Sequence, residues 1–439
     1  MIAYQKNIGG IVCLLPDGRV EFLHPSVEPL LKDINTQGLL SESIDFDDYI
    51  LNDPLVELKN FHLSAPAIAF IETTNLCNLR CRHCYADSAV KRSNELDTGL
   101  IFSLIDDLAE MGVLQVFLTG GELFAHPDAV SIIQHARTQP FSTQIFTNGL
   151  LITKEKLAAI PPGQSFFISF DTADPVRTIR GKMDFPTLRE RFEWMKSYGH
   201  VFRTAISVHR NNIQDAEEIF EWCAQNGYPR PQWLETHPVG RALLHPDMFL
   251  QPDQVEEVFE VYKRCMNRYS QEPIDDVVTD GLDDNQISAM QSIDTIKFCQ
   301  RLEVATGREK CARSMAYINS AGDVYPCSNC MAGNLYKGGN LRDHSFAEIW
   351  ETGFDAFREI TFDQYKVCDS CPVNEAGIWC QFRCPPLATN ISRNPLGCGA
   401  TDYLKLFMVR AHHYWEMRKQ KRIKLTLDPA RQYYSTKWA

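Results

Sequence analysis

Three cysteines stand close together at Cys77, Cys81 and Cys84, and their spacing carries more chemical information than any other stretch of the chain. The apolar run at 67–71 predicts a short buried strand, and the Thr and Asn residues after it end the strand and start a loop. Soft iron prefers thiolate ligands, and three thiolates on one loop can hold three irons of a four-iron cluster. The fourth iron would stay open to another ligand, so the spacing predicts a reactive iron–sulfur centre.

Core thiols or a zinc site are the alternatives for this loop. A structural zinc site usually takes four protein ligands from paired Cys-x-x-Cys turns. The loop offers three cysteines and His83, whose place inside the loop suits a tetrahedral site poorly. The iron–sulfur interpretation is therefore favoured.

A glycine pair lies one predicted helix and one predicted strand beyond the cysteines. Strand 113–118 ends at Gly120, Gly121 and Glu122, where glycine permits a tight turn and a close backbone approach to a ligand. The cysteine loop followed by this turn closely resembles the radical S-adenosylmethionine (SAM) enzymes. The resemblance implies that S-adenosylmethionine binds at the open iron and that Gly120, Gly121 and Glu122 engage its amino group.

Alternating strands and helices must position these groups. Their lengths predict a parallel sheet with helical crossovers, and by resemblance an α/β fold with a partial (β/α)6 TIM-like barrel. After the strand at 67–71 the predicted strands are 113–118, 143–146, 165–170, 203–208 and 232–235, and the predicted helices are 97–111, 129–137, 154–159, 186–198 and 216–226.

Ligands in such sheets lie at the carboxyl ends of the strands. The polar residues expected there are Glu122, Asn148, Ser169, Asp171, His209, Glu235 and His237. By resemblance, Asn148, Ser169 and Asp171 lie near the ribose and methionine moieties, and Gly240 and Arg241 lie near the adenosine. Each polar residue could equally cap a helix.

A second cysteine-rich region begins after residue 298. Cys311 and Cys327 bracket a predicted hairpin, and Cys-x-x-Cys at 368–371 can hold one metal centre from a single tight turn. Zinc ribbons use such pairs too. The pattern closely resembles the SPASM extension of radical SAM enzymes, which holds two auxiliary 4Fe-4S clusters. The resemblance assigns Cys311, Cys327 and Cys384 to the nearer cluster and Cys368, Cys371, Cys380 and Cys398 to the farther one; Cys330 or Cys299 supplies the missing ligand.

The remaining stretches are less specific. A hairpin and a short helix precede residue 66 and could grip a leader peptide or cap the barrel, and a basic, aromatic tail closes the chain. The acidic run within 275–284 predicts a solvated face. The expected domains are 1–65 (strand and helix segment), 66–245 (barrel), 246–298 (helical connector), 299–404 (SPASM) and 405–439 (tail).

Charge and composition exclude some classes. A formal net charge of -12 argues against a general nucleic-acid binder. The chain has neither a secretory signal nor an apolar run that could span a bilayer, so we expect a cytoplasmic protein without a membrane partner.

The resemblance implies an enzyme with S-adenosylmethionine and three 4Fe-4S clusters. We expect a 5′-deoxyadenosyl radical to take hydrogen from a ribosomally made precursor peptide, whose side chains are then oxidatively cross-linked. An electron donor such as flavodoxin or ferredoxin is implied. The alternatives are a formylglycine-generating sulfatase-maturing enzyme and a non-catalytic iron–sulfur carrier or zinc scaffold. Oxidation also needs a base, for which Asp171, His209, Glu235 and His237 are the candidates by position alone; each could instead contact cofactor or make a structural hydrogen bond.

Overall fold

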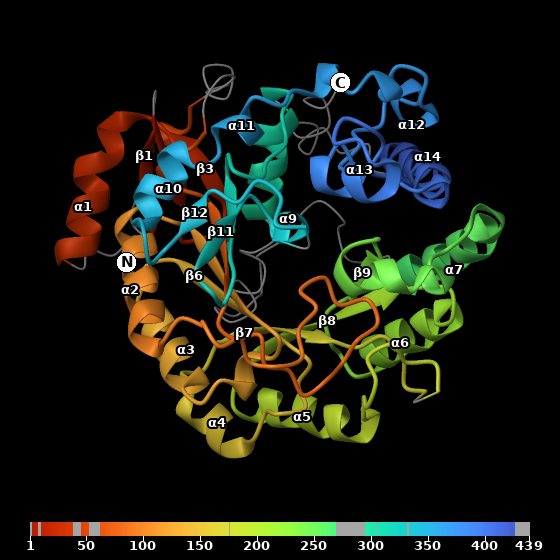
Figure 1. Ribbon diagram of the computed structural model, residues 1–439, viewed down its shortest axis with the longest axis horizontal. Coiled ribbons are helices and arrows are strands. Elements are labelled where there is room, and N and C mark those ends of the chain that lie inside the picture. The colour runs from red at the N-terminus through yellow and green to blue at the C-terminus, as the bar shows by residue number, and fades with distance from the viewer. Residues whose placement is uncertain are drawn as a thin grey trace.

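The computed structural model describes residues 2–7, 10–37, 45–51, 62–174, 176–268, 295–304, 306–331 and 333–425 (Figure 1). The acidic run expected within 275–284, and the side chains of the basic tail from 418 onward, lie outside the described residues.

One nine-stranded sheet forms the centre of the molecule, in the order β12-β11-β10-β4-β5-β6-β7-β8-β9. All pairs from β10 through β4 to β9 are parallel, as the alternating pattern predicts. The strands are β4 (Ile68–Glu72), β5 (Gln115–Thr119), β6 (Ser142–Thr147), β7 (Ser165–Ser169), β8 (Val201–Val208), β9 (Gln232–Glu235), β10 (Met315–Ile318), β11 (Asp323–Tyr325) and β12 (Gly339–Asn340).

Helices α2 to α6 follow the outside of the curved sheet as an arc (Figure 1). Each presents an apolar stripe to the sheet, which is the periodicity that predicted it. They are α2 (Thr98–Glu110), α3 (Ala129–Arg137), α4 (Lys154–Ala159), α5 (Phe185–Ser197) and α6 (Ile213–Gln225).

A row of aromatic rings crosses the sheet on one face. Phe70 stacks on Phe117 with centroids 4.6 Å apart, Phe117 on Phe146 at 5.3 Å, and Phe146 lies 5.0 Å from Phe167. Tyr317 of β10 extends the row beside Phe70. Such pairs contribute about 0.5–1.5 kcal/mol each beyond their buried area, so the row holds neighbouring strands in register.

The hairpin of the cysteine-rich region joins the barrel sheet directly. Strand β10 lies parallel to β4, with Met315 opposite Ile68 and Ile318 opposite Ile71, and β11 and β12 continue outward. The sequence pattern predicts the hairpin but not this pairing. Barrel and cysteine-rich region therefore share one continuous sheet.

Two expected domain boundaries fall inside helices. A helix covers 295–304 and crosses the boundary at 298/299, and α14 (Asp402–Leu425) crosses the one at 404/405. Each of these two helices therefore joins segments that the sequence analysis separated. Helix α14 also packs on α7 (Val255–Arg268). The other helices of the cysteine-rich region are α9 (Ser328–Met331), α10 (Phe346–Thr352), α11 (Asp355–Arg358), α12 (Pro372–Glu375) and α13 (Pro385–Ser392).

The N-terminal segment is a three-stranded antiparallel sheet with one helix. Strands β2 (Gly10–Leu14) and β3 (Val20–Leu23) form the predicted hairpin, α1 (Glu28–Gln37) follows it, and β1 (Tyr4–Asn7) is an additional strand that the sequence did not predict. The outer edge of β3 is occupied, because Leu23 bridges Ile50 and the Leu51 N–H donates to the Phe22 carbonyl at 2.9 Å. Across the described ranges, no helix has the length and apolar character that a membrane crossing would require.

Candidate cluster and cofactor site

The cysteine loop leaves the carboxyl end of β4 and brings three thiols close to backbone groups. The Leu79 N–H donates to the Cys77 sulfur at 3.4 Å, and the Ser88 N–H donates to the Cys84 sulfur at 3.4 Å. Burial raises the pKa of Cys77 to about 12, so the site favours a thiolate only when a cation binds there. The backbone N–H donors and the three half-buried thiols together fit the iron–sulfur interpretation.

Arg241 anchors this loop from the far side of the barrel. Its side chain is 6% exposed and donates to the Cys81 carbonyl (2.7 Å), the Ser88 carbonyl (2.8 Å) and the Asp87 carboxylate (2.7 Å). The resemblance placed Arg241 near the adenosine. In the structure its guanidinium holds the cluster loop, and the contact of Gly240 and Arg241 with the adenosine stays a prediction.

Two glycines are required by the close approach of backbone segments. A Cβ on Gly121 would lie 2.4 Å from the Leu76 carbonyl oxygen, and one on Gly240, at φ +59°, would lie 2.3 Å from the Tyr85 carbonyl oxygen. Real Cβ atoms do not come so near backbone, so no larger residue fits without moving the loop. The first glycine pair therefore admits the cluster loop, and its contact with S-adenosylmethionine stays a prediction.

Glu122 is a buried carboxylate that ties the ends of β5 and β6 together. It accepts from the Thr147 hydroxyl (2.6 Å), the Asn148 N–H (2.8 Å) and the Phe124 N–H (3.1 Å). The Asn148 side chain donates in turn to Asn78 of the cluster loop at 2.8 Å. Glu122 and Asn148 thus lie beside the loop, as predicted, and Ser169 lies half-buried at the end of β7. Their contacts with S-adenosylmethionine stay predictions.

Asp171 is a poor base because it is already paired. Arg180 donates to both of its carboxylate oxygens, at 2.5 and 2.9 Å, and the Ser207 N–H donates at 2.8 Å. Although burial acts to raise it, the Arg180 charge and these hydrogen bonds leave the pKa of Asp171 below its ordinary value. The pair positions the barrel strands near Cys81, whose thiol faces the Arg180 carbonyl at 3.9 Å.

Of the histidine candidates, His209 is buried and His237 is half-buried, and both rings are neutral. Burial lowers the pKa of His209 to about 4 and that of His237 to about 4. The Asn211 N–H donates to His209 Nδ1 at 3.2 Å, so the neutral ring carries its proton on Nε2 and presents a donor rather than a base. His237 packs its ring against Phe382 at 5.3 Å, and its Nδ1 is a buried atom without a hydrogen-bond partner among the described residues.

Glu235 at the end of β9 retains the properties of a base. Burial raises its pKa to about 7, against a hydrogen bond from the Trp233 indole at 3.0 Å. It lines a small cavity of about 10 Å³ together with Tyr403 and Leu250. A carboxyl with such a pKa can accept a proton near neutral pH.

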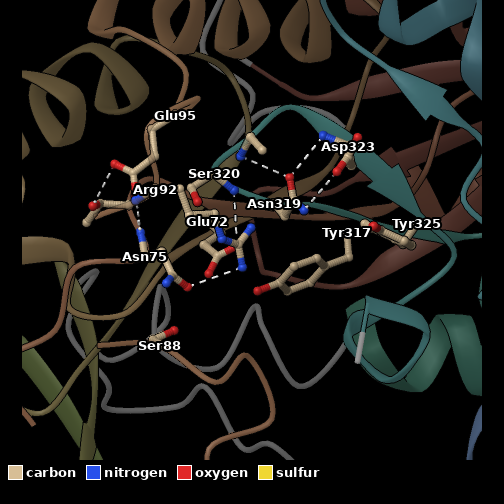
Figure 2. A network of polar contacts seen from close by, with 12 residues as sticks. Glu72, Asn75, Ser88, Arg92, Glu95, Tyr317, Asn319, Ser320, Asp323 and Tyr325 are labelled. Atoms are coloured by element: carbon tan, nitrogen blue, oxygen red, sulfur yellow. Dashed lines mark hydrogen bonds and ion pairs between the residues drawn. The ribbon is translucent and has the colours of Figure 1, made fainter. Parts of the chain in front are cut away.

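Glu72 is a buried carboxyl that the sequence analysis missed. It ends β4 and is 1% exposed, and one of its oxygens accepts from the Ser320 N–H at 3.0 Å and lies 3.8 Å from Arg92 (Figure 2). Burial raises its pKa to about 7. An acidic residue closing an apolar strand directly before the cluster loop was the available signal.

A polar network around Glu72 links the cluster loop to the cysteine-rich hairpin (Figure 2). Arg92 donates to the Asn75 side chain at 3.2 Å, and Glu95 accepts from the backbone N–H groups of Asn75 (2.8 Å) and Arg92 (3.0 Å). On the hairpin, Ser320 accepts from the Leu96 N–H at 2.7 Å. The start of the cluster loop and the hairpin are therefore one hydrogen-bonded unit.

Four buried or half-buried cysteines form an inner group beside this hairpin. The sulfurs of Cys327 and Cys330 lie 3.9 Å apart, and hydrogen bonds from Cys311 and Cys330 lower the pKa of Cys327 far below its ordinary value. Cys384 interacts electrostatically with Cys327 and accepts from the Asn329 amide at 3.8 Å. These four are the residues predicted for the nearer cluster, with Cys330 as the fourth.

Cys299 lies apart from this group in its contacts. It is fully buried, and its thiol donates to the Ser314 carbonyl at 3.8 Å. The hydrogen-bond pattern therefore favours Cys330 over Cys299 as the additional ligand.

An outer group of cysteines lines a cavity of about 240 Å³. All four residues predicted for the farther cluster contribute to its wall, namely Cys368, Cys371, Cys380 and Cys398. The described part of the chain contains no set of three or more His, Cys, Asp or Glu arranged around a single metal ion. A cubane places four irons between its thiolates, so a cysteine-lined cavity fits it.

Comparison with protein families gives two matches. The radical SAM superfamily matches residues 71–223, and the SPASM iron–sulfur cluster-binding domain matches residues 310–372. The first includes the cluster loop and the glycine pair, and the second includes the hairpin and Cys-x-x-Cys. S-adenosylmethionine and iron–sulfur clusters are therefore confirmed as the cofactors of these domains.

Two curated relatives are similar in sequence. The PqqA peptide cyclase of Methylocella silvestris is 25% identical over 369 residues, covering 79% of this chain and 91% of that protein. The antilisterial bacteriocin subtilosin biosynthesis protein AlbA of Bacillus subtilis is 28% identical over 189 residues, which are 41% of this chain and 42% of that protein.

Solved structures share the fold. Streptococcus suis SuiB bound to precursor peptide SuiA has a TM-score of 0.66 at 15% identity and covers 92% of this chain and 98% of its own. Native anSMEcpe with bound AdoMet has a TM-score of 0.60 at 16% identity, covering 82% of this chain and 98% of its own. The fold, the cysteine loop and the two family matches identify this chain as a radical SAM enzyme that carries a SPASM iron–sulfur domain.

Proposed function

We propose that this enzyme matures a ribosomally made precursor peptide by oxidatively cross-linking its side chains. The observation that carries the proposal is the presence of two auxiliary cysteine groups joined to the barrel sheet, since an oxidative reaction needs somewhere for its surplus electron to go. The extended similarity to PqqA peptide cyclase supports a peptide substrate.

Cys77, Cys81 and Cys84 hold the first cluster in this proposal. When bound there, S-adenosylmethionine is reductively cleaved and supplies a 5′-deoxyadenosyl radical that takes a hydrogen atom from unactivated carbon. The turn after β5 and the ends of β6 and β7 orient it, through Gly120, Gly121, Glu122, Asn148 and Ser169. The electron for cleavage comes from a donor such as flavodoxin or ferredoxin.

The cross-link balances without further reagents. Two substrate groups each lose one hydrogen as a new bond forms between them. One leaves as a hydrogen atom and ends in 5′-deoxyadenosine; the other leaves as a proton and an electron. Glu235 takes the proton, since it is the candidate base whose pKa, about 7, suits the task, and clusters held by the two auxiliary cysteine groups would supply the acceptor for the electron.

Cys311, Cys327, Cys330 and Cys384 hold the inner auxiliary cluster, and Cys368, Cys371, Cys380 and Cys398 hold the outer one. Replacing Cys330 by Ala should remove or convert one auxiliary cluster, while Cys299→Ala, an equally buried thiol, should keep full iron. Iron and sulfide per chain and the EPR spectrum of reduced protein read this out. Full iron in Cys330→Ala with loss in Cys299→Ala would reverse the assignment.

The N-terminal sheet acts as a cap in this proposal. A peptide that extended β3 would need its outer edge, which Ile50 and Leu51 occupy. The contact of Gly112 with the Tyr4 carbonyl seats this sheet on the barrel.

The test uses full-length, anaerobically reconstituted protein. We expect about twelve irons per chain, as three cubanes require, and 5′-deoxyadenosine from S-adenosylmethionine under strong reductant. The variant with Cys77, Cys81 and Cys84 all changed to Ala should cleave none and keep about eight irons. Full cleavage in that variant would remove the assignment of the first cluster.

The peptide is found by co-expressing short open reading frames adjacent to the gene and sequencing the products by mass spectrometry. A product that has lost two hydrogens and yields linked fragments supports cross-linking. Conversion of a Cys or Ser to formylglycine in a sulfatase peptide would instead establish the sulfatase-maturing alternative.

A further inference from the structure

Tyr365 is part of the wall of the outer cysteine cavity. It lies between two short 3-10 helices, Phe362–Gln364 and Lys366–Cys368, and its carbonyl accepts from the Cys368 N–H at 2.9 Å. Its ring also packs edge-on against Phe362 with centroids 6.4 Å apart. The turn that presents Cys368 therefore fixes the position of Tyr365 as well.

The hydroxyl of Tyr365 is buried without a hydrogen-bond partner. The residue is 1% exposed, and its oxygen meets no donor or acceptor among the described residues. Buried tyrosine hydroxyls normally have a partner, because leaving one unpaired is unfavourable. Because Tyr365 belongs to the wall of a cysteine-lined cavity, a cluster held there would be in a position to supply the missing partner.

The same residue lies close to both cysteine groups. Its strongest charge interactions are with Cys384 of the inner group and with the adjacent Glu309, and it also interacts with Cys368 of the outer group. A tyrosine phenol, whose ordinary pKa is about 10, keeps its proton at neutral pH, so this hydroxyl can act as a hydrogen-bond donor.

Positive groups also approach the outer cavity. Arg383 and Lys405 line it, and Arg383 donates to Asn374 at 3.0 Å while its Nε is buried without a partner. These charges remain in place when Tyr365 is changed, so the tyrosine contribution can be measured separately.

We propose that the hydroxyl of Tyr365 donates a hydrogen bond to a sulfur atom of the auxiliary clusters between which it lies, and thereby raises the reduction potential of that cluster. A hydrogen bond to sulfur spreads the negative charge that reduction adds, so the reduced state gains most. The inference rests on the proposed auxiliary clusters. It makes Tyr365 a positioning and tuning residue for the electron sink.

The test compares Tyr365→Phe with the wild-type holoenzyme, without substrate. We expect full iron, and an auxiliary cluster whose reduced-to-oxidised ratio at fixed potential falls about tenfold, which for a one-electron couple is about 59 mV. EPR-monitored redox titration measures this. Tyr403→Phe is the matched control, because it removes another buried, unpartnered hydroxyl, whose charge interactions are with Glu235 rather than a cysteine.

Each outcome decides something. Full iron with unchanged potentials for both auxiliary clusters overturns the inference but leaves the proposed function standing. Wild-type protein without iron in the auxiliary sites overturns the cluster assignment itself. If Tyr365→Phe loads iron incompletely, Tyr365→His replaces it as the test variant, because it keeps a ring N–H donor. Tyr365→His should load iron fully and retain the wild-type reduction potential. A fall of about 59 mV in its reduction potential would count against the inference.

Discussion

Arg241 shows how much of the cluster site depends on a single side chain. Its guanidinium reaches three acceptors on the loop that carries Cys77, Cys81 and Cys84, while its own backbone N–H donates to the Cys84 carbonyl at 2.9 Å. The loop thus takes its shape partly from a residue more than 150 positions away.

Replacing Arg241 by Ala should leave three loop acceptors unsatisfied. We expect a loss of about 2–4 kcal/mol of stability, a poorly retained first cluster and at least tenfold slower 5′-deoxyadenosine formation. Iron analysis measures retention of the first cluster, and product chromatography measures 5′-deoxyadenosine formation. Arg82→Ala is the control: Arg82 lies on the same loop but makes an exposed ion pair with Asp247, so it should change little. Equal effects in the two variants would contradict the anchoring role.

A second prediction concerns the proton leaving the substrate. Glu235 can accept it only when deprotonated, and burial raises its pKa to about 7, so the rate of peptide modification should rise with pH through about 7. Glu235→Gln should lower that rate about 10²-fold or more while 5′-deoxyadenosine formation persists.

The pH dependence of mass-spectrometric product formation is the readout, with Glu256→Gln, an exposed carboxyl paired with Arg410, as control. A Glu235→Gln enzyme that keeps both the rate and the wild-type pH profile would assign the role to another group; burial raises the pKa of Glu72 and of Glu303 to about 7 as well.

At the level of elements, the turn after β5 and the cluster loop are packed backbone to backbone. The Gly121 and Glu122 N–H groups donate to the Thr74 and Leu76 carbonyls at 2.7 and 2.9 Å. This close backbone contact requires glycine at position 121 whether or not the turn also binds a ligand, and it fixes the position of the cluster loop.

Gly121→Ala should therefore push the loop out of place. The new Cβ would meet the Leu76 and Asn75 carbonyl oxygens at 2.4 and 2.7 Å. We expect loss of about four irons, those of the first cluster, with the auxiliary iron retained. Gly99→Ala, in the first turn of α2, meets the flexible Asp97 side chain at 3.3 Å and should keep full iron. Retention of all iron in Gly121→Ala would show that the loop can yield.

The elements themselves were largely predictable from the sequence, because their signals are local. Helices α3 and α4 and strand β9 begin and end at the residues that the sequence predicted. The pairing of β10 with β4 was not predictable, since a strand pattern does not say which edge it joins. The two cysteine groups were predicted from spacing and from the family resemblance, whereas the contacts made by Arg241, Arg180 and Glu72 depend on tertiary packing that the spacing of residues does not reveal.

Over the whole molecule, buried carboxyls make stability depend on pH. Burial raises the pKa of Glu72 from 4.5 to about 7, so the native state binds more protons than the unfolded state between these values. The contribution of Glu72 to the free energy of unfolding therefore falls by up to about 3 kcal/mol as pH rises through that window, and it stays low above it.

Glu72→Gln removes the titration and keeps an oxygen that can accept from Ser320. Its melting temperature relative to wild type should thus increase from pH 5 to pH 8, roughly the window set by this shift, in anaerobic calorimetry. Glu110→Gln, at an exposed position of α2, should show no such trend. A constant difference between Glu72→Gln and wild type across this range would contradict the assignment.

The shared sheet also determines how late in synthesis β4 can pair with β10. Glu72 ends β4, and its partner Ser320 lies 248 residues further along the chain. At about 5–20 residues per second, a ribosome needs on the order of ten to fifty seconds to bridge that distance. During that interval the apolar strand Ile68–Ile71 has one edge without its neighbour, which is a site for wrong pairing. A nascent chain halted before β10 should therefore aggregate or recruit chaperones, and a shortened gene that ends there should give insoluble protein rather than a free barrel.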